Sequence, residues 1–161
     1  MAIRKAVIRD AEDIRAIIAI HAKKGRMLPR ALYEIYEDIR AFHVAEENGV
    51  VVGCSAAHIY GREYTPENAG KNVLAEIKSL AVLPKKHHHG IGTLLVKQVL
   101  DEAKSLGVTK VFTLTYASEF FKKMGFKEIH KSELPQKIWS DCRSCMKFPD
   151  ECDEIAMVVE L

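Results

Sequence analysis

Apolar and polar residues follow two different periods along this chain, one typical of helices and one typical of strands. In residues 91–106 the apolar positions recur at helical spacing, and Gly107 follows as a left-handed C-terminal cap. Residues 75–82 are mostly apolar or small and stop just before Pro84. Proline fixes its own φ and pushes the preceding residue into an extended conformation, so the strand must end there. The pattern predicts a strand, a tight turn and an amphipathic helix at the centre of the chain.

Further elements are predicted on both sides of this central unit. Asn48-Gly49 is a strong hairpin signal between two apolar runs, and the polar residues 61–72 indicate a loop. The expected strands cover residues 3–8, 42–46, 50–60, 110–115, 126–130 and 155–159, and the expected helices cover residues 10–25, 31–40 and 118–124. Because no internal repeat or linker interrupts this series, we expect residues 1–161 to form a single domain.

The composition is that of a globular protein and argues against a nucleic-acid-binding, a membrane-spanning or a secreted protein. With 161 residues, 48% hydrophobic residues and 29% charged residues, the chain can bury an ordinary globular core. A net charge of +2 gives no basic stripe for nucleic acid, and no apolar run approaches the roughly 20 residues of a membrane span. The first nine residues lack the apolar segment of a signal peptide, and the four cysteines do not form a disulfide framework. These features favour a cytoplasmic protein.

Two glycines, Gly90 and Gly92, lie between the central strand and the central helix. Positions without a side chain let a turn bring its backbone N–H groups close to a ligand. A helix N-terminus carries free N–H donors and a partial positive charge, which favour an anion such as phosphate. A Gly-x-Gly before a helix is just as often only a tight connection, so the observation alone leaves both interpretations open.

The segment L-A-V-x-P, followed by a polar stretch, G-x-G and a helix, resembles the acyl-CoA-binding core of the GNAT acetyltransferases. In that superfamily the loop is usually Gln/Arg-x-x-Gly-x-Gly/Ala, and its amides hold the diphosphate of CoA. Here the loop is H-H-H-G-I-G, so both glycines match and His87 replaces the usual Gln or Arg. Backbone binding tolerates this replacement. The resemblance also implies an irregularity in the strand near Leu80 and Val82, which frees a backbone N–H for the thioester oxygen and other backbone groups for the pantetheine amides. The resemblance implies that acetyl-CoA contacts Leu80, Ala81, Val82, His87, His88, His89, Gly90, Ile91, Gly92, Thr93, Ser118 and Phe121.

The resemblance extends over nearly the whole chain. The order β-α-α-β-β-β-α-β-α-β-β is that of the GNAT fold, so we expect an α/β (α+β) protein with a mixed, mostly antiparallel sheet of about seven strands and helices on both faces. The segment F-F-K-K-M-G-F at residues 120–126 resembles F-Y-x-K-x-G-F of many members. Three further segments are similar to short bacterial N-acetylglutamate synthases: G-R-M-L-P-R, A-E-I-K-S-L-A-V and the tail W-S-D-C-R-S-C-M-K-F-P-x-x-C-D-E. This implies an acetyl-CoA-dependent N-acetyltransferase of arginine biosynthesis that acts on the α-amino group of a small amino acid, L-glutamate above all.

Acetyl transfer needs a base for the amine, and Glu76 is the candidate. Strand alternation places Glu76, Lys78 and Leu80 on one face, among apolar residues that would raise the pKa of the carboxylate. In A-E-I, Glu76 also occupies the position of the catalytic glutamate of some histone-acetylating GNATs. The alternative is that Glu76 only pairs with Lys78 at the rim of the sheet.

The general acid that would protonate the departing thiolate is less well marked. Many GNATs place a tyrosine in the helix after the fifth strand, but the matching residue here is Phe121, which has no proton to donate. Tyr116, five residues earlier, is the candidate substitute, with packing or substrate stacking as the alternative role.

Recognition of an amino acid requires cations for its carboxylates, with arginine preferred for its bidentate geometry. Arg30, in the loop between the first two helices, is the first candidate, followed by Lys78 and Arg26. For most of the lysines and arginines, a solvated surface charge is the simpler interpretation.

Cys142, Cys145 and Cys152 have the spacing of a partial zinc site, but a fourth ligand is missing, so we expect reduced structural thiols and no metal. Two other functions stay open: acetylation of another amine, such as a peptide N-terminus or a polyamine, and a non-catalytic CoA-binding module with a zinc-held docking surface. A homodimer also stays open, because nothing in the sequence sets the oligomeric state.

Overall fold

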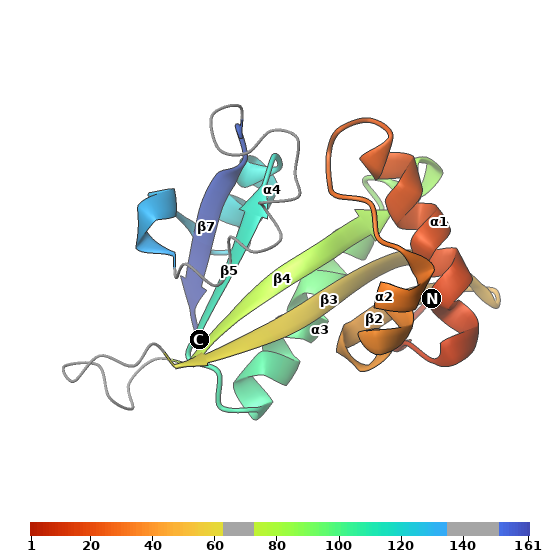
Figure 1. Cartoon of the computed structure of the whole chain (residues 1–161), viewed down its shortest axis with the longest axis horizontal. Helices are drawn as coiled ribbons and strands as arrows, with labels where there is room; N and C mark the ends of the chain where they lie inside the picture. The colour runs from red at the N-terminus through yellow and green to blue at the C-terminus, as the bar shows by residue number, and fades with distance from the viewer. Residues whose placement is uncertain (63–72, 135–151) are drawn as a thin grey trace.

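A seven-stranded mixed sheet forms the centre of the protein, in the strand order β1-β2-β3-β4-β5-β7-β6 (Figure 1). The computed structural model describes residues 1–62, 73–134 and 152–161. Among the strands of these residues, β4 and β5 are parallel neighbours, and the other neighbouring strands are antiparallel. The strands are β1 (Ala2–Lys5), β2 (Phe42–Glu47), β3 (Val50–Arg62), β4 (Val73–Val82), β5 (Lys110–Thr115), β6 (Lys127–Ile129) and β7 (Ile155–Glu160).

Helices cover both faces of this sheet. α1 (Ala11–Ala22) and α2 (Leu32–Glu37) bury Ile14, Ile18 and Ile35 against β2 and β3 on one face. α3 (Ile91–Ser105) and α4 (Ser118–Lys123) pack on the opposite face, against β4, β5 and β7. The helical spacing of the apolar residues of α3 explains this packing, because it places Val96, Val99 and Ala103 on one side of the helix.

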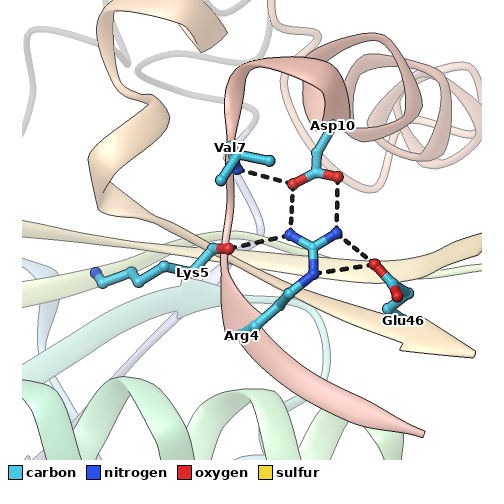
Figure 2. Close-up of polar contacts among 5 residues, drawn as sticks. All are labelled: Arg4, Lys5, Val7, Asp10 and Glu46. Carbon is cyan, nitrogen blue, oxygen red and sulfur yellow. Dashed lines mark hydrogen bonds and ion pairs between the residues drawn. The ribbon is translucent and has the colours of Figure 1, made fainter. Parts of the chain in front are cut away.

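The start of the chain is fastened to the sheet by one guanidinium group. Arg4 on β1 donates to both carboxylate oxygens of Asp10, at 2.7 and 2.9 Å, and to Glu46 on β2 (Figure 2). The Asp10 carboxylate also accepts the N–H of Val7 at 2.8 Å. The bonds from Arg4 hold the pKa of Asp10 below its usual range. This cluster fixes the entry into α1.

The expected fold, with about seven strands and helices on both faces, is confirmed. Several boundaries differ. The first strand ends at Lys5 instead of residue 8, because a 3-10 turn, Ile8–Asp10, forms around the Asp10 carboxylate. The second helix ends at Glu37, and the rest of its predicted length is a separate 3-10 turn, Ile39–Ala41. β3 reaches Arg62, into the predicted loop, whose remaining residues lie outside the described parts of the chain.

Candidate functional site

The site begins where two neighbouring strands separate. β4 and β5 pair only where Leu74, Ala75 and Glu76 lie opposite residues 110–112, although β4 continues to Val82 and β5 to Thr115. The strands diverge beyond that point (Figure 1). Inside the gap, the hydroxyl of Thr113 donates to the carbonyl of Ile77 at 3.1 Å. A splayed pair of parallel strands leaves backbone donors and acceptors available to a ligand that enters between them.

A bulge lies in β4 beside this gap. Ser79 has a φ of 54°, and the pairing with β3 shifts so that Cys54 lies opposite Ala81 while Ala56 lies opposite Lys78. One extra residue on β4 reverses the alternation of side chains beyond it. Leu80 therefore packs with the core beneath α3, and the prediction that it shares a face with Glu76 and Lys78 is wrong.

The turn between β4 and α3 presents a row of backbone N–H groups. His88 and Gly90 have φ values of 65° and 76°, in the left-handed region that favours glycine. Within the described parts of the chain, none of the N–H groups of residues 88–93 donates to a backbone carbonyl, and the first helical bond runs from Leu94 to Gly90 at 3.1 Å. N–H groups in such a turn and at a helix N-terminus are suited to an anion.

The gap and the turn open into one cleft of about 1250 Å³. Its walls include the backbone of residues 76–82, the turn, the ends of β5 and α4, and the loop at residues 26–30. One cationic side chain, Lys86, borders the turn. It forms an ion pair with Glu47, and this contact lowers the pKa of the Glu47 carboxyl. The shape of this cleft, with a turn rich in N–H donors at one end and a splayed strand pair, would suit a long, phosphate-bearing ligand.

Glu76 lies in this cleft and is 6% exposed. The hydroxyl of Tyr60 on β3 donates to one of its carboxylate oxygens at 2.6 Å, and the Nζ of Lys78 lies 4.0 Å from the same oxygen. Both expected roles of Glu76 therefore have a structural counterpart: the carboxylate is buried as a base should be, and it also lies near Lys78. A buried carboxylate with a defined hydrogen bond is a typical general base.

Arg30 also lies in the cleft, with its side chain 14% exposed. Its guanidinium forms an ion pair with Asp38, and its Nε lies 3.9 Å from a carboxylate oxygen of Glu34. His58 on β3 reaches the same Asp38 oxygen at 3.6 Å. Arg26 lines the cleft and is exposed. All three predicted substrate-binding cations, Arg26, Arg30 and Lys78, thus line one cleft with Glu76.

The predicted CoA contacts fall into two groups. Most of them line the cleft: Leu80, Ala81, Val82, His87, His88, Gly90, Ile91, Gly92, Thr93 and Phe121. Ser118 and His89 are not part of the lining, and the ring of His89 instead contacts the carbonyl of His87 at 2.8 Å. Phe121 is 2% exposed and packs on Phe126, so its ring belongs mainly to the core. Tyr116 lines the cleft at the end of β5 and is 39% exposed.

The described cysteines show no catalytic character. Cys54 is fully buried, and burial raises the pKa of its thiol to about 12. Cys152 has a free thiol, and Lys131 contacts both the backbone carbonyl and the sulfur of this residue. Cys142 and Cys145 lie outside the described residues, and no cluster of metal-ligand side chains occurs among the residues that are described. Within those residues, no helix has the length and apolar character that a bilayer crossing requires.

Sequence patterns did not place several cleft residues, among them His21, His58 and Tyr60. The register of β3 against β4 places His58 opposite Glu76, with Tyr60 on the same face. The alternation of side chains along β3 places His58 and Tyr60 on the same face. The register between β3 and β4 is not encoded in either strand, because ten residues separate the two strands in the sequence. His21 lies on α1, and only the packing of α1 against β4 brings it to the cleft.

Comparison with known proteins agrees with this geometry. Residues 38–128 match the family model described as an acetyltransferase (GNAT) domain. The chain is 45% identical over 159 residues to an uncharacterised N-acetyltransferase of Chlorobaculum tepidum, which covers 99% of this chain and 96% of the relative. An amino-acid acetyltransferase of Mycobacterium tuberculosis is 34% identical over 146 residues, covering 88% of this chain and 78% of the relative.

Two solved structures have the same fold over nearly the whole chain. A Mycobacterium tuberculosis protein crystallised in complex with CoA superimposes with a TM-score of 0.80 and 30% identity, covering 100% of this chain and 99% of that one. The N-acetylglutamate synthase from Neisseria gonorrhoeae, complexed with coenzyme A and N-acetyl-glutamate, superimposes with a TM-score of 0.82 and 27% identity, covering 99% of this chain and 35% of that one. With its splayed strands, the glycine-bearing turn before α3 and these relatives, the chain belongs to the GNAT family and is an N-acetyltransferase whose acetyl donor is acetyl-CoA.

Proposed function

We propose that this protein acetylates the α-amino group of a small amino acid, with L-glutamate as the leading acceptor, in arginine biosynthesis. The observation that carries the proposal is the shared cleft, in which a buried carboxylate, Glu76, lies together with Arg26, Arg30 and Lys78. A dicarboxylic amino acid presents one amine to a base and two carboxylates to cations. Relatives named amino-acid acetyltransferase and a structural neighbour crystallised with N-acetyl-glutamate support this choice.

In this proposal acetyl-CoA supplies an activated acetyl group, and the residues of the chain position and deprotonate the acceptor. The N–H groups of residues 88–92 bind the diphosphate, so that the thioester lies in the gap between β4 and β5. Glu76 accepts the proton of the amine, directly or through water, while Tyr60 keeps the carboxylate oriented. Backbone N–H groups at the bulge stabilise the oxyanion, and Tyr116 is the candidate proton donor to the thiolate.

The experiment is a CoA-release assay with a panel of amines at a fixed acetyl-CoA concentration. We expect L-glutamate to give a higher kcat/KM than glutamine, glycine, lysine or spermidine, and mass spectrometry to find a singly acetylated product. If glutamate is turned over no faster than glycine or lysine, the proposed acceptor is wrong.

A second class of acceptor has one specific observation in its favour. Glu34, Glu37 and Asp38 also line the cleft, at the end that carries Arg30. Carboxylates in that position favour a cationic amine, such as a polyamine or a peptide N-terminus, if they remain free. Because Asp38 is already paired with Arg30, an amino-acid acceptor is the better match.

A further inference from the structure

The last carbonyl of β4 faces the gap between the splayed strands. Val82 lies opposite Gly53 on β3, and the N–H of Leu83 donates to the carbonyl of Val52 at 2.9 Å. This bond makes Val82 and Gly53 a non-hydrogen-bonded pair, in which the backbone groups of both residues point away from each other's strand. The Val82 carbonyl therefore points to the side that β5 has left, where the sheet offers it no donor.

Two imidazole rings form hydrogen bonds with this carbonyl. The Nε2 of His21 lies 2.8 Å from the Val82 oxygen, and the Nε2 of His87 lies 2.9 Å from the same atom. The two rings are stacked, with centroids 5.6 Å apart and planes inclined by 14°. A carbonyl oxygen has two lone pairs and no proton, so both nitrogens must be the donors. Each ring thus carries a proton on Nε2.

The shared carbonyl connects two segments that are far apart in the sequence. His21 lies in the last turn of α1 and is buried, and its own carbonyl accepts the N–H of Arg26 at 3.2 Å. His87 opens the turn at residues 87–92, which borders the cleft. The stacked pair therefore fixes the turn to both α1 and the end of β4.

We propose that His21 and His87 are positioning residues that hold the turn at residues 87–92 in its CoA-binding conformation through the Val82 carbonyl. Their contribution is the donated N–H of each ring, and neither imidazole needs to contact CoA. A glutamine at position 87 can make the same donation, because its amide nitrogen carries protons and its side chain has a similar reach. A leucine keeps the volume and removes the donor.

The test is calorimetric titration of the full-length protein with CoA, which needs no acceptor amine and so is independent of the proposed amino-acid specificity. We expect His87→Leu and His21→Leu each to raise the Kd for CoA about tenfold, since a hydrogen bond of about 1 kcal/mol is lost and the turn is loosened. His87→Gln should stay within about threefold of the wild type. His130→Leu removes an exposed imidazole outside the cleft and serves as the matched control, with no change in Kd expected.

Two results overturn the proposal. If His87→Gln binds CoA as weakly as His87→Leu, the ring of His87 acts on the ligand itself; if either leucine variant binds like the wild type, the pair does not position the turn. Long-range ¹H–¹⁵N spectra of the wild type at pH 8 keep the question decidable should His21→Leu not fold. We expect a protonated Nε2 on both rings, and a ring protonated only on Nδ1 contradicts the shared donation.

Discussion

At the scale of single residues, the proposed chemistry depends on Glu76 as the base. The carboxylate is 6% exposed and holds a hydrogen bond from Tyr60, so it is desolvated and fixed in one orientation. Glu76→Gln keeps the size and the contact with Tyr60 but removes the base. We expect kcat to fall about 100-fold near pH 7, where the acceptor amine is protonated, and less near pH 9.5, where solvent has already removed part of its protons.

The measurement for this variant is the pH profile of kcat/KM from pH 6.5 to 10. Glu128→Gln, a change at an exposed carboxylate on β6, is the control and should leave the profile unchanged. An unaltered pH profile in Glu76→Gln would remove Glu76 from the role of base and leave its contact with Lys78 as its function.

A substitution of Arg30 tests how the amino-acid acceptor is recognised. Its guanidinium is oriented by Asp38 and lies in the cleft, so a carboxylate of the substrate can bind its remaining donors. Arg30→Ala should raise the KM for the amino acid at least tenfold, because a charge-assisted hydrogen bond is lost, and should leave the KM for acetyl-CoA unchanged. Steady-state kinetics with each substrate varied in turn measure both values. Arg9→Ala, at an exposed arginine, is the control; an equal rise in both KM values would show that Arg30 only supports the structure.

At the scale of elements, the bulge in β4 decides what faces the cleft. Ser79 has a positive φ of 54°, which costs a residue with a branched Cβ more than it costs serine, and costs glycine nothing. Ser79→Val should lower the free energy of unfolding by about 1–2 kcal/mol and weaken CoA binding, whereas Ser79→Gly should keep CoA affinity. Urea unfolding together with CoA titration checks both. A valine variant that is as stable and binds as tightly as the wild type would mean that the bulge tolerates an ordinary strand conformation.

The helices and strands were predictable because each has a clear period. α3 and β5 were placed within one residue, since the apolar positions of α3 recur at helical spacing between Gly90 and Gly107 and β5 is rich in β-branched residues. The resemblance to the GNAT family implied an irregularity in this strand, but the residues alone did not place it, because Ser79 has no intrinsic preference for a positive φ. Strict alternation therefore placed Leu80 on the wrong face of the strand.

The candidate site was predictable only in part, for a related reason. The turn at residues 87–92 and the Arg30 loop are contiguous segments, so their motifs could be recognised in the sequence. Tyr60 and His21 reach the cleft through long-range packing against β4, and no local pattern encodes such a contact. Only the structure shows that Tyr60 contacts Glu76 and that His21 contacts the carbonyl of Val82.

At the scale of the whole molecule, the cluster of Arg4, Asp10 and Glu46 connects the first strand, the start of α1 and β2 (Figure 2). The bonds from Arg4 keep the pKa of Asp10 lower in the folded than in the unfolded protein. The ionised carboxylate therefore stabilises the fold above about pH 4, and this stabilisation disappears as the pH falls through the folded-state pKa.

Asp10→Asn should lower the free energy of unfolding by about 2 kcal/mol at pH 7, because it leaves the guanidinium without a charged partner. The difference in melting temperature between variant and wild type should shrink between pH 5 and pH 3. Asp13→Asn, in the first turn of α1, is the matched control. A difference that is constant over this pH range would show that the charge of Asp10 does not stabilise the fold.

The proposed function requires that the turn at residues 87–92 binds the diphosphate of acetyl-CoA and directs its thioester into the gap between β4 and β5. A crystal structure of the protein grown with CoA tests this binding. We expect diphosphate oxygens within about 3 Å of the backbone nitrogens of this turn, with the thiol end between Leu80 and Thr115 and close to Glu76. A diphosphate bound elsewhere, with the N–H groups of the turn bonded to the protein itself, would contradict it.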